Sequence, residues 1–327
     1  MTQQTTQNQN SIPKPPLIIL SGPTAAGKTE LSISLAKRIG GEIISADSMQ
    51  VYKGFDIGTA KIRKEEMQGI PHYLIDELEA DEEFNVFEFQ KRAKAYVQTI
   101  YENGHIPIIV GGTGFYIQAL LYDINFTEEE TDKAYRAELE EKARSEGALT
   151  LHQMLEEVDP EAASQIHANN IKRTIRALEY YHETGKRISE HNEEQRLRES
   201  PYNFAYFVLN RERAVLYERI NQRVAVMEQE GLFEEVQRLL DAGISADSLA
   251  MQGLGYKETV DCLVGKCTKE EALHRIRQGT RHFAKRQITW FKREREVCWL
   301  NYEDYADQQA MLDAILQILR EKNIIPS

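Results

Sequence analysis

One segment near the start of the chain has the residue types and spacing of a phosphate-binding loop. Residues 22–29 read GPTAAGKT and fit the pattern G-x-x-x-x-G-K-[ST], in which backbone N–H groups wrap an anion. The pattern follows an expected strand at 17–20 and opens an expected helix at 28–39, which is the context that such a loop requires. Lys28 would supply a positive charge, and the Thr29 hydroxyl could ligate Mg²⁺. We therefore predict a phosphate site formed by Gly22, Pro23, Thr24, Ala25, Ala26, Gly27, Lys28 and Thr29.

The sequence has no acidic residue at the position where a typical P-loop nucleotidase has the acid that holds Mg²⁺. Such proteins end a later apolar strand with an acid that holds Mg²⁺ through water, but here the run 106–110 is followed by GGTG at 111–114. Asp47 instead follows a second expected strand at 42–45, which places it at the carboxyl edge of the sheet. Asp47 could there ligate a metal, orient a substrate or accept a proton. The alternative is an acid that only caps a turn or a helix.

Continuous apolar runs alternate with helical patterns in the two outer parts of the chain. Strands are expected at 17–20, 42–45, 106–110, 204–209 and 297–300, and long helices at 213–240 and from 269 to about 293. This alternation is typical of a parallel sheet covered on both faces. We therefore predict an α/β fold: a P-loop NTPase-like core with a parallel sheet, formed by residues 15–121 and 205–327, a helical insertion domain at 122–204, and a disordered tail at 1–14.

Composition narrows the class of protein. Of the 327 residues, 41% are hydrophobic and 28% charged, an ordinary balance for a folded chain. No apolar run is long enough to cross a membrane and the first residues have no secretory pattern, so we expect a cytoplasmic protein with no membrane partner. Three cysteines without metal-ligand spacing indicate free, reduced thiols. The net charge of −12 argues against a protein that simply coats nucleic acid.

The charge balance reverses locally near the C-terminus. Between residues 269 and 295, nine basic residues stand against three acidic ones, a local charge of +6. Arg277, Arg281 and Lys285 recur at intervals of four, so one face of the expected helix has a row of cations. This row is either a solvated face that pairs with acids elsewhere or a surface for the phosphates of a nucleic acid.

Seven blocks of sequence point to a family when they are taken together. They are GPTAAGKT (22–29), ADSMQVYKGFDIGTAK (46–61), PHYLID (71–76), VGGTGFY (110–116), IKRTIRALE (171–179), QGLGYKE (252–258) and AKRQITWFK (284–292). In this order the chain resembles bacterial tRNA dimethylallyltransferases, also called tRNA isopentenylpyrophosphate transferases. The resemblance implies an Mg²⁺-dependent transfer of a dimethylallyl group from dimethylallyl diphosphate to the exocyclic 6-amino group of an adenosine, with release of pyrophosphate. That adenosine is 3′-adjacent to the anticodon in tRNAs reading codons that begin with U.

The resemblance also implies roles for individual residues. Asp47 would accept the proton of the attacking amine, Arg223 would be a second cation on the diphosphate, and Thr113 would lie near the target nucleoside. The alternatives are a surface ion pair for Arg223, a hydroxyl that caps the next helix for Thr113, and a solvated helix face for the cations at 172–176. The implied contacts with the tRNA anticodon stem-loop, bound by a monomer, are Asp47, Ser48, Met49, Gln50, Thr113, Arg136, Lys172, Arg173, Thr174, Ile175, Arg176, Gln252, Gly255, Tyr256, Lys257, Arg281, Lys285, Arg286, Gln287, Thr289, Trp290 and Lys292.

Two other functions fit parts of the sequence. A small-molecule or nucleoside kinase would place residues 24–29 around ATP and use Asp47 as the base for a hydroxyl, although an Arg-rich lid of obvious form is missing. A non-enzymatic RNA-binding regulator would use the P-loop only as a ligand sensor. ATP-dependent phosphotransfer would favour the kinase, and turnover of dimethylallyl diphosphate by tRNA would exclude the regulator.

Overall fold

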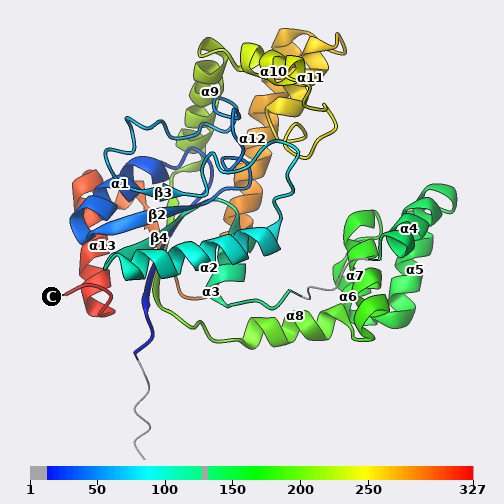
Figure 1. Ribbon diagram of the computed structural model, residues 1–327, viewed down its shortest axis with the longest axis horizontal. Coiled ribbons are helices and arrows are strands. Elements are labelled where there is room, and N and C mark those ends of the chain that lie inside the picture. The colour runs from blue at the N-terminus through cyan, green and yellow to red at the C-terminus, as the bar shows by residue number, and fades with distance from the viewer. Residues whose placement is uncertain (1–12, 127–131, 327) are drawn as a thin grey trace, which may run out of the picture. The chain divides into compact units, whose positions relative to one another are not determined.

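The computed structural model describes residues 13–126 and 132–326, which form two compact units (Figure 1). The larger unit extends to Leu121 and resumes at Pro201, and the smaller unit is Tyr122–Ser200. Most of the predicted tail at 1–14 lies outside the described residues. The predicted insertion at 122–204 extends slightly too far, because β5 (Asn203–Asn210) already belongs to the sheet of the larger unit.

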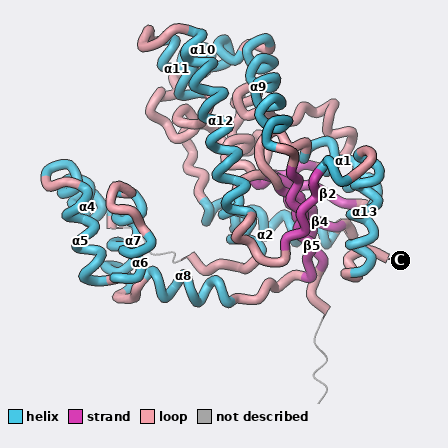
Figure 2. The backbone as a smooth tube through the Cα atoms, turned by 180° about the vertical axis from the view of Figure 1, so that it is seen from behind, coloured by secondary structure: helices cyan, strands magenta, loops and turns pink. Residues whose placement is uncertain are grey.

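Six strands of the described chain form one parallel sheet in the larger unit (Figure 2). Its order is β3-β2-β4-β1-β5-β6. The strands β1 (Pro16–Ser21), β2 (Gly41–Ala46), β4 (Ile106–Gly111), β5 and β6 (Val297–Asn301) confirm the five predicted ones to within one or two residues. The edge strand β3 (His72–Tyr73) was not predicted, because two residues are too short to show a pattern of alternation.

Helices cover both faces of this sheet. Because side chains alternate along a strand, Ile18 and Leu20 of β1 share one face, where they pack with α1 (Lys28–Ile39) and α13 (Gln308–Glu321). On the other face, α2 (Val86–Glu102) contacts β2 and β4 and packs against α3 (Gly114–Leu121). Because helices cover both faces of the sheet, apolar residues are not confined to alternate positions of the strands but occupy them almost continuously.

Four further helices of the larger unit pack against one another. They are α9 (Arg213–Gln229), α10 (Leu232–Asp241), α11 (Tyr256–Leu263) and α12 (Lys269–Phe291). The single helix predicted over 213–240 is two helices, because Gly231 has a left-handed backbone with φ of 98° and begins α10. A capping box between Thr268 and Glu271 fixes the start of α12, whose last turns contact α3.

The smaller unit contains only helices among its described residues. They are α4 (Lys133–Ser145), α5 (Ala148–Val158), α6 (Pro160–Gln165), α7 (Ile171–Thr184) and α8 (Ile188–Leu197). Leu139, Leu151 and Leu178 belong to its core. Asp159 accepts hydrogen bonds from the Ala162 amide that starts α6 and from the Ser189 amide and hydroxyl of α8, so one buried carboxylate joins two helices.

None of the helices in the described chain, in either unit, has the length and apolar character of a membrane span.

Candidate active site

Three turns meet at the carboxyl edge of the sheet. The P-loop (22–29) follows β1, Asp47 follows β2, and the glycine-rich turn at 111–114 follows β4. These strands are neighbours in the order β2-β4-β1, so the three turns lie side by side, where open parallel sheets bind their ligands. The Thr113 amide donates to the Ala46 carbonyl across 3.2 Å and thereby joins the second turn to the third.

The backbone of the P-loop requires glycine at its first position. Gly22 has a φ of 146°, and a Cβ there would lie 2.6 Å from the Leu209 carbonyl oxygen. The loop then leads into the N-terminus of α1, whose first amides and helix dipole favour an anion. The Lys28 ammonium donates to the carbonyls of Gly22 and Pro23, each at 2.9 Å, so it lies inside the curve of the loop.

Arginines next to and within α9 surround the same loop. Arg219 donates to the Ala25 carbonyl at 2.9 Å, and Arg223, one turn further along the helix, reaches the Thr24 hydroxyl at 3.4 Å. Arg211, just before α9, donates to the Ala26 carbonyl at 3.2 Å. Among the described residues Arg223 forms no ion pair. The structure therefore does not support the alternative that Arg223 belongs to a surface ion pair. Three guanidinium groups and one ammonium therefore surround the predicted phosphate site.

Crowding and burial of these cations change their acidity. Burial and, to a smaller extent, the nearby Arg223 lower the pKa of Lys28 to about 8, although the Asp47 carboxylate acts in the opposite direction. Burial also lowers the pKa of Arg223, again opposed by Asp47, while Arg219 adds to the lowering. Asp47 therefore lies close enough to both cations to interact with their charges. The site combines an excess of positive charge with a single carboxylate, an arrangement suited to a multiply charged anion.

Asp47 has one oxygen in a turn and one oxygen available. Its Oδ1 accepts from the amides of Met49 at 2.9 Å and Gln50 at 3.3 Å, which is the Asx-turn geometry considered as an alternative. Within the described chain Oδ2 has no hydrogen-bond partner. The turn thus fixes the direction of the side chain, and the second oxygen can accept a proton or a hydrogen bond from a ligand.

The side chain of Gln287 joins two of the three turns. Its Oε1 accepts from the Thr24 amide and its Nε2 donates to the Gly112 carbonyl, both at 2.9 Å. A Cβ at Gly112 would lie 2.1 Å from that Nε2, and a Cβ at Gly114 would lie 2.2 Å from Trp290 Cδ1. The glycines of the third turn therefore make room for α12, and α12 connects this turn with the P-loop.

A model of the IPP transferase family matches residues 50–294, three quarters of the chain. This chain belongs to the IPP transferase family. It is 59% identical to a tRNA dimethylallyltransferase of Lachnoclostridium phytofermentans over 310 residues, which are 95% of this chain and 99% of that protein.

Several solved structures resemble this one. A tRNA delta(2)-isopentenylpyrophosphate transferase of Staphylococcus epidermidis is 47% identical, with a TM-score of 0.70, over 94% of this chain and all of that chain. A eukaryotic dimethylallyltransferase acting on tRNA is 29% identical, with a TM-score of 0.81, over 96% of this chain and 81% of the other. Both likenesses span the two units described above.

The structure leaves most of the predicted tRNA contacts at or near the surface. Ser48, Met49, Gln50 and Thr113 are half-buried at the sheet edge, and the Thr113 hydroxyl makes no capping hydrogen bond among the described residues. On α12, Trp290 is half-buried and packs with the exposed Phe115. The exposed predicted contacts are Lys172, Arg173 and Arg176 in the smaller unit, and Gln252, Lys257, Lys285, Arg286, Thr289 and Lys292 in the larger unit.

Several residues that were predicted to contact tRNA are buried, and this corrects their assignment. Thr174 and Ile175 lie in the interior of the smaller unit because they occupy the inner face of α7. Gly255 begins α11, the Tyr256 ring is 1% exposed, and Gln287 is 6% exposed. In this structure these residues lie in the interior and connect neighbouring segments, and they do not face a ligand at the surface.

Two of the cations predicted to contact tRNA, Arg136 and Arg281, make contacts with side chains of their own unit. Arg136 of α4 lies 3.3 Å from Glu140 and 3.4 Å from the buried Glu179 of α7. Arg281 donates to Asn221 of α9 at 2.5 Å. The row of cations predicted on α12 is therefore interrupted at Arg281, whose side chain faces α9, while Lys285 is exposed.

Three residues were not predicted from the sequence: Arg211 and Arg219, which lie around the site, and Glu235, which lies behind it. Arg219 precedes the predicted Arg223 by four residues on an expected helix, so helical periodicity could have identified it. Glu235 is a buried acid on the apolar face of α10, between Leu232 and Val236. A charged residue on such a face is the only sequence feature that points to it.

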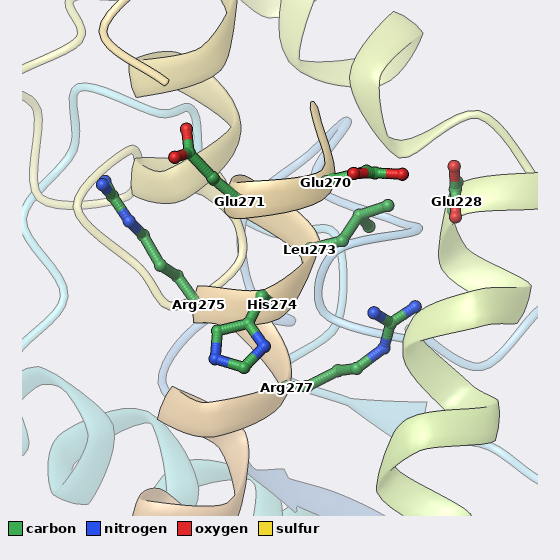
Figure 3. Close-up of a pocket in the computed structure, with 7 residues that line it drawn as sticks. All are labelled: Glu228, Glu270, Glu271, Leu273, His274, Arg275 and Arg277. Carbon is green, nitrogen blue, oxygen red and sulfur yellow. The ribbon is translucent and has the colours of Figure 1, made fainter. Parts of the chain in front are cut away.

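A separate cavity lies along the first turns of α12, at residues 270–277 (Figure 3). It has a volume of about 730 Å³, and the side chains around it include Glu228, Glu270, His274 and Arg277. Arg277 precedes Gln287 by ten residues, about 15 Å along the helix, so this cavity is remote from the P-loop. Its mixture of acids and bases lacks the positive excess of the sheet-edge site.

We predict that the affinity for inorganic pyrophosphate falls as the pH rises above about 8. Lys28 is charged below its pKa of about 8 and neutral above it. Because the anion binds more tightly to charged Lys28, Lys28 must take up a proton when the anion binds at high pH, and this lowers the affinity. The affinity should approach a loss of about tenfold per pH unit above that pKa. Calorimetric titrations at about pH 7 and about pH 9 measure this change.

The Lys28→Ala chain, titrated in parallel, is the control, since pyrophosphate itself gains and loses protons over this range. Subtracting its pH dependence leaves the contribution of Lys28. Identical pH dependence in the two proteins would contradict the position of Lys28 at the anion.

Proposed function

We propose that this chain transfers a dimethylallyl group from dimethylallyl diphosphate to the exocyclic 6-amino group of the adenosine 3′-adjacent to the anticodon. The substrates are tRNAs reading codons that begin with U, and pyrophosphate is released. The observation that supports this most directly is the convergence of Lys28, Arg223 and Asp47 on one edge of the sheet. The similarity to the tRNA dimethylallyltransferase of Lachnoclostridium phytofermentans named above extends over nearly the whole chain.

The P-loop is suited to hold the leaving group of this reaction. As the bond between the allylic carbon and the diphosphate oxygen breaks, the electron pair and the negative charge pass to the diphosphate. Lys28 and Arg223 lie where they would neutralise that charge, which lowers the barrier because they are already in place and poorly solvated. A kinase would use the same loop for ATP, but its chemistry would not explain the family relationship.

Asp47 would handle the proton of the attacking amine. The lone pair of an exocyclic adenine amine is delocalised into the ring, so the nitrogen is a weak nucleophile. As nitrogen forms its bond to the allylic carbon, its proton must leave, and Asp47 Oδ2 is available to take it. The hydrogen bonds from Met49 and Gln50 keep Oδ1 in the turn and so keep the carboxylate in one orientation.

Mg²⁺ would be held by few protein atoms. No group of three or more His, Cys, Asp or Glu side chains in the described chain could form a metal site. The Thr29 hydroxyl, exposed in the first turn of α1, would ligate the ion together with oxygens of the diphosphate and water, a ligand set that Mg²⁺ accepts. The ion would supply further neutralisation of the leaving group.

The tRNA would be bound by exposed cations of both units. Lys172, Arg173 and Arg176 belong to α7 of the smaller unit, and Lys285 and Arg286 to α12 of the larger one. Lysine and arginine contacts to phosphate position an RNA without reading its sequence. The target adenosine must leave the stack of the anticodon loop to reach Asp47, at a cost of a few kcal/mol. We propose that a monomer in the cytoplasm performs this reaction.

The function is tested by mass analysis of nucleosides from tRNA incubated with the protein, Mg²⁺ and dimethylallyl diphosphate. We expect one adenosine per substrate tRNA, next to the anticodon, to gain a dimethylallyl group in place of a hydrogen. ATP in place of dimethylallyl diphosphate should give no modification. An unmodified anticodon loop would contradict the proposal, and ATP-dependent phosphotransfer to a small molecule would favour the kinase.

We predict that Asp47→Asn separates binding from chemistry. Asparagine keeps the size of the side chain and can cap the turn as well as aspartate does, but it cannot take a proton at neutral pH. Loss of a positioned general base typically costs about 10² to 10⁴ in rate. Single-turnover transfer at saturating substrates, measured over a range of Mg²⁺ concentrations, gives that rate.

The exposed Asp81 provides the matched control, and Asp81→Asn should transfer at the normal rate. A rate for Asp47→Asn within a few-fold of the unmodified chain would leave Asp47 as a turn residue only. Recovery of the rate with added Mg²⁺ would instead make it a metal ligand.

A further inference from the structure

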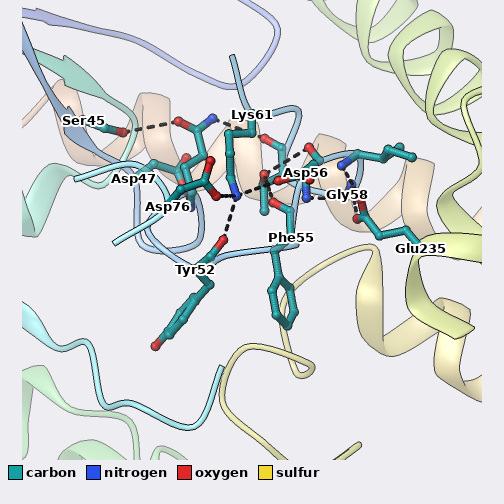
Figure 4. A network of polar contacts seen from close by, with 12 residues as sticks. Ser45, Asp47, Tyr52, Phe55, Asp56, Gly58, Lys61, Asp76 and Glu235 are labelled. Atoms are coloured by element: carbon teal, nitrogen blue, oxygen red, sulfur yellow. Dashed lines mark hydrogen bonds and ion pairs between the residues drawn. The ribbon is translucent and has the colours of Figure 1, made fainter. Parts of the chain in front are cut away.

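Glu235 is a buried carboxylate with four hydrogen-bond donors around it, and Figure 4 shows it beside the backbone of Gly58. It is 2% exposed, and its Oε2 accepts from the amides of Asp56 at 3.2 Å and Ile57 at 2.8 Å. Its Oε1 accepts from the Gly58 amide at 3.2 Å and the Tyr256 hydroxyl at 2.7 Å. No cation pairs with Glu235 among the residues that the structure describes. Three consecutive amides therefore compensate the burial of this charge, so the carboxylate and the backbone at 56–58 stabilise each other.

The opposite side of this backbone faces the P-loop site. We call residues 56–60 the connecting loop. The carbonyl of Thr59 accepts from Arg223 Nη2 at 3.4 Å and from Gln50 Nε2 at 3.3 Å, and the Ala60 carbonyl accepts from the same Gln50 nitrogen at 3.4 Å. The connecting loop thus has Glu235 on one side and two residues of the sheet-edge site on the other.

Packing leaves the connecting loop little freedom to move. A Cβ at Gly58 would lie 2.5 Å from the Tyr256 ring, and the ring of Phe55 lies 4.9 Å from that of Tyr256. At the far end, the ammonium of the buried Lys61 donates to the Tyr52 carbonyl and to the carboxylates of Asp56 and Asp76. The position of the Thr59 carbonyl is therefore determined by contacts outside the site.

Arg223 is the side chain that depends on this carbonyl. A long guanidinium side chain has several rotamers, and both hydrogen bonds that Arg223 makes to described residues are long, at 3.4 Å to the Thr24 hydroxyl and 3.4 Å to the Thr59 carbonyl. If the connecting loop moved, one of the two contacts that orient the guanidinium would be lost. A cation that must meet a diphosphate is effective only if it is already oriented toward it.

We propose that Glu235 is a positioning residue for prenyl transfer: it fixes the connecting loop, whose Thr59 carbonyl orients Arg223 toward the diphosphate. This inference rests on the proposed function, in which Arg223 binds that group. Because Glu235 is buried behind the connecting loop, it would touch neither substrate. Its effect is transmitted through backbone amides and should therefore appear in the affinity for dimethylallyl diphosphate.

The test begins with Glu235→Gln and the adjacent, exposed Glu234→Gln as its matched control. Glutamine has the same size, but one of its two acceptors becomes an NH₂ group that faces amide donors, so at least one backbone N–H loses its partner. We expect dimethylallyl diphosphate to bind about tenfold more weakly to Glu235→Gln, by calorimetric titration, and normally to Glu234→Gln. Tyr256→Phe, which removes one of the four donors and keeps the ring, should weaken binding about threefold.

A double-mutant cycle with Arg223→Ala distinguishes positioning from general destabilisation. If Glu235 acts through Arg223, Glu235→Gln should weaken binding less than twofold once Arg223 is already alanine. An equal loss on both backgrounds, or normal binding by both Glu235→Gln and Tyr256→Phe, would overturn the inference. Failure of the unmodified chain to bind dimethylallyl diphosphate would instead contradict the proposed function, so the two failures can be told apart.

Discussion

The candidate site depends on the two hydrogen bonds of the Gln287 carboxamide. The P-loop and the turn after β4 follow different strands, and each could adopt several conformations without a fixed partner. Gln287 accepts from the Thr24 amide and donates to the Gly112 carbonyl, and it is shielded from water. Because an unpartnered buried amide or carbonyl costs about 1 to 3 kcal/mol, both turns are held to the positions that satisfy it. The glycines at 112 and 114 are required because α12 approaches their backbone so closely.

Electrostatics explains why such a framework is needed. Lys28, Arg211, Arg219 and Arg223 crowd around one loop, and burial lowers the pKa values of Lys28 and Arg223. Mutual repulsion would spread these cations apart unless other groups held them, and the P-loop carbonyls do so for three of them. A diphosphate would relieve the repulsion, whereas a neutral ligand would not. A chain with a net charge of −12 thus places a local positive excess where its anionic substrate would bind.

The sequence predicted the strands well, and it predicted that the P-loop follows β1 and Asp47 follows β2, because each of these features has a local pattern. Apolar runs bounded by glycine identify parallel strands, and the spacing of Gly22, Gly27 and Lys28 allows few other interpretations. What the sequence could not predict are partnerships across long stretches of chain. Gln287 was predicted to contact tRNA, and only the structure places it beside Thr24, 263 residues earlier. Glu235 is part of no recognisable motif, since three of its four partners are backbone amides that any sequence could supply.

The central claim, that α12 holds the diphosphate site in its working form through Gln287, can be measured in one experiment. Gln287→Leu removes both hydrogen bonds with little change in volume, and Gln278→Leu makes the same replacement at an exposed position of the same helix. Calorimetric titration with dimethylallyl diphosphate should show binding about tenfold weaker for Gln287→Leu and unchanged for Gln278→Leu. Equal, undiminished affinity in both variants would contradict the account, since the P-loop would then hold its shape without α12.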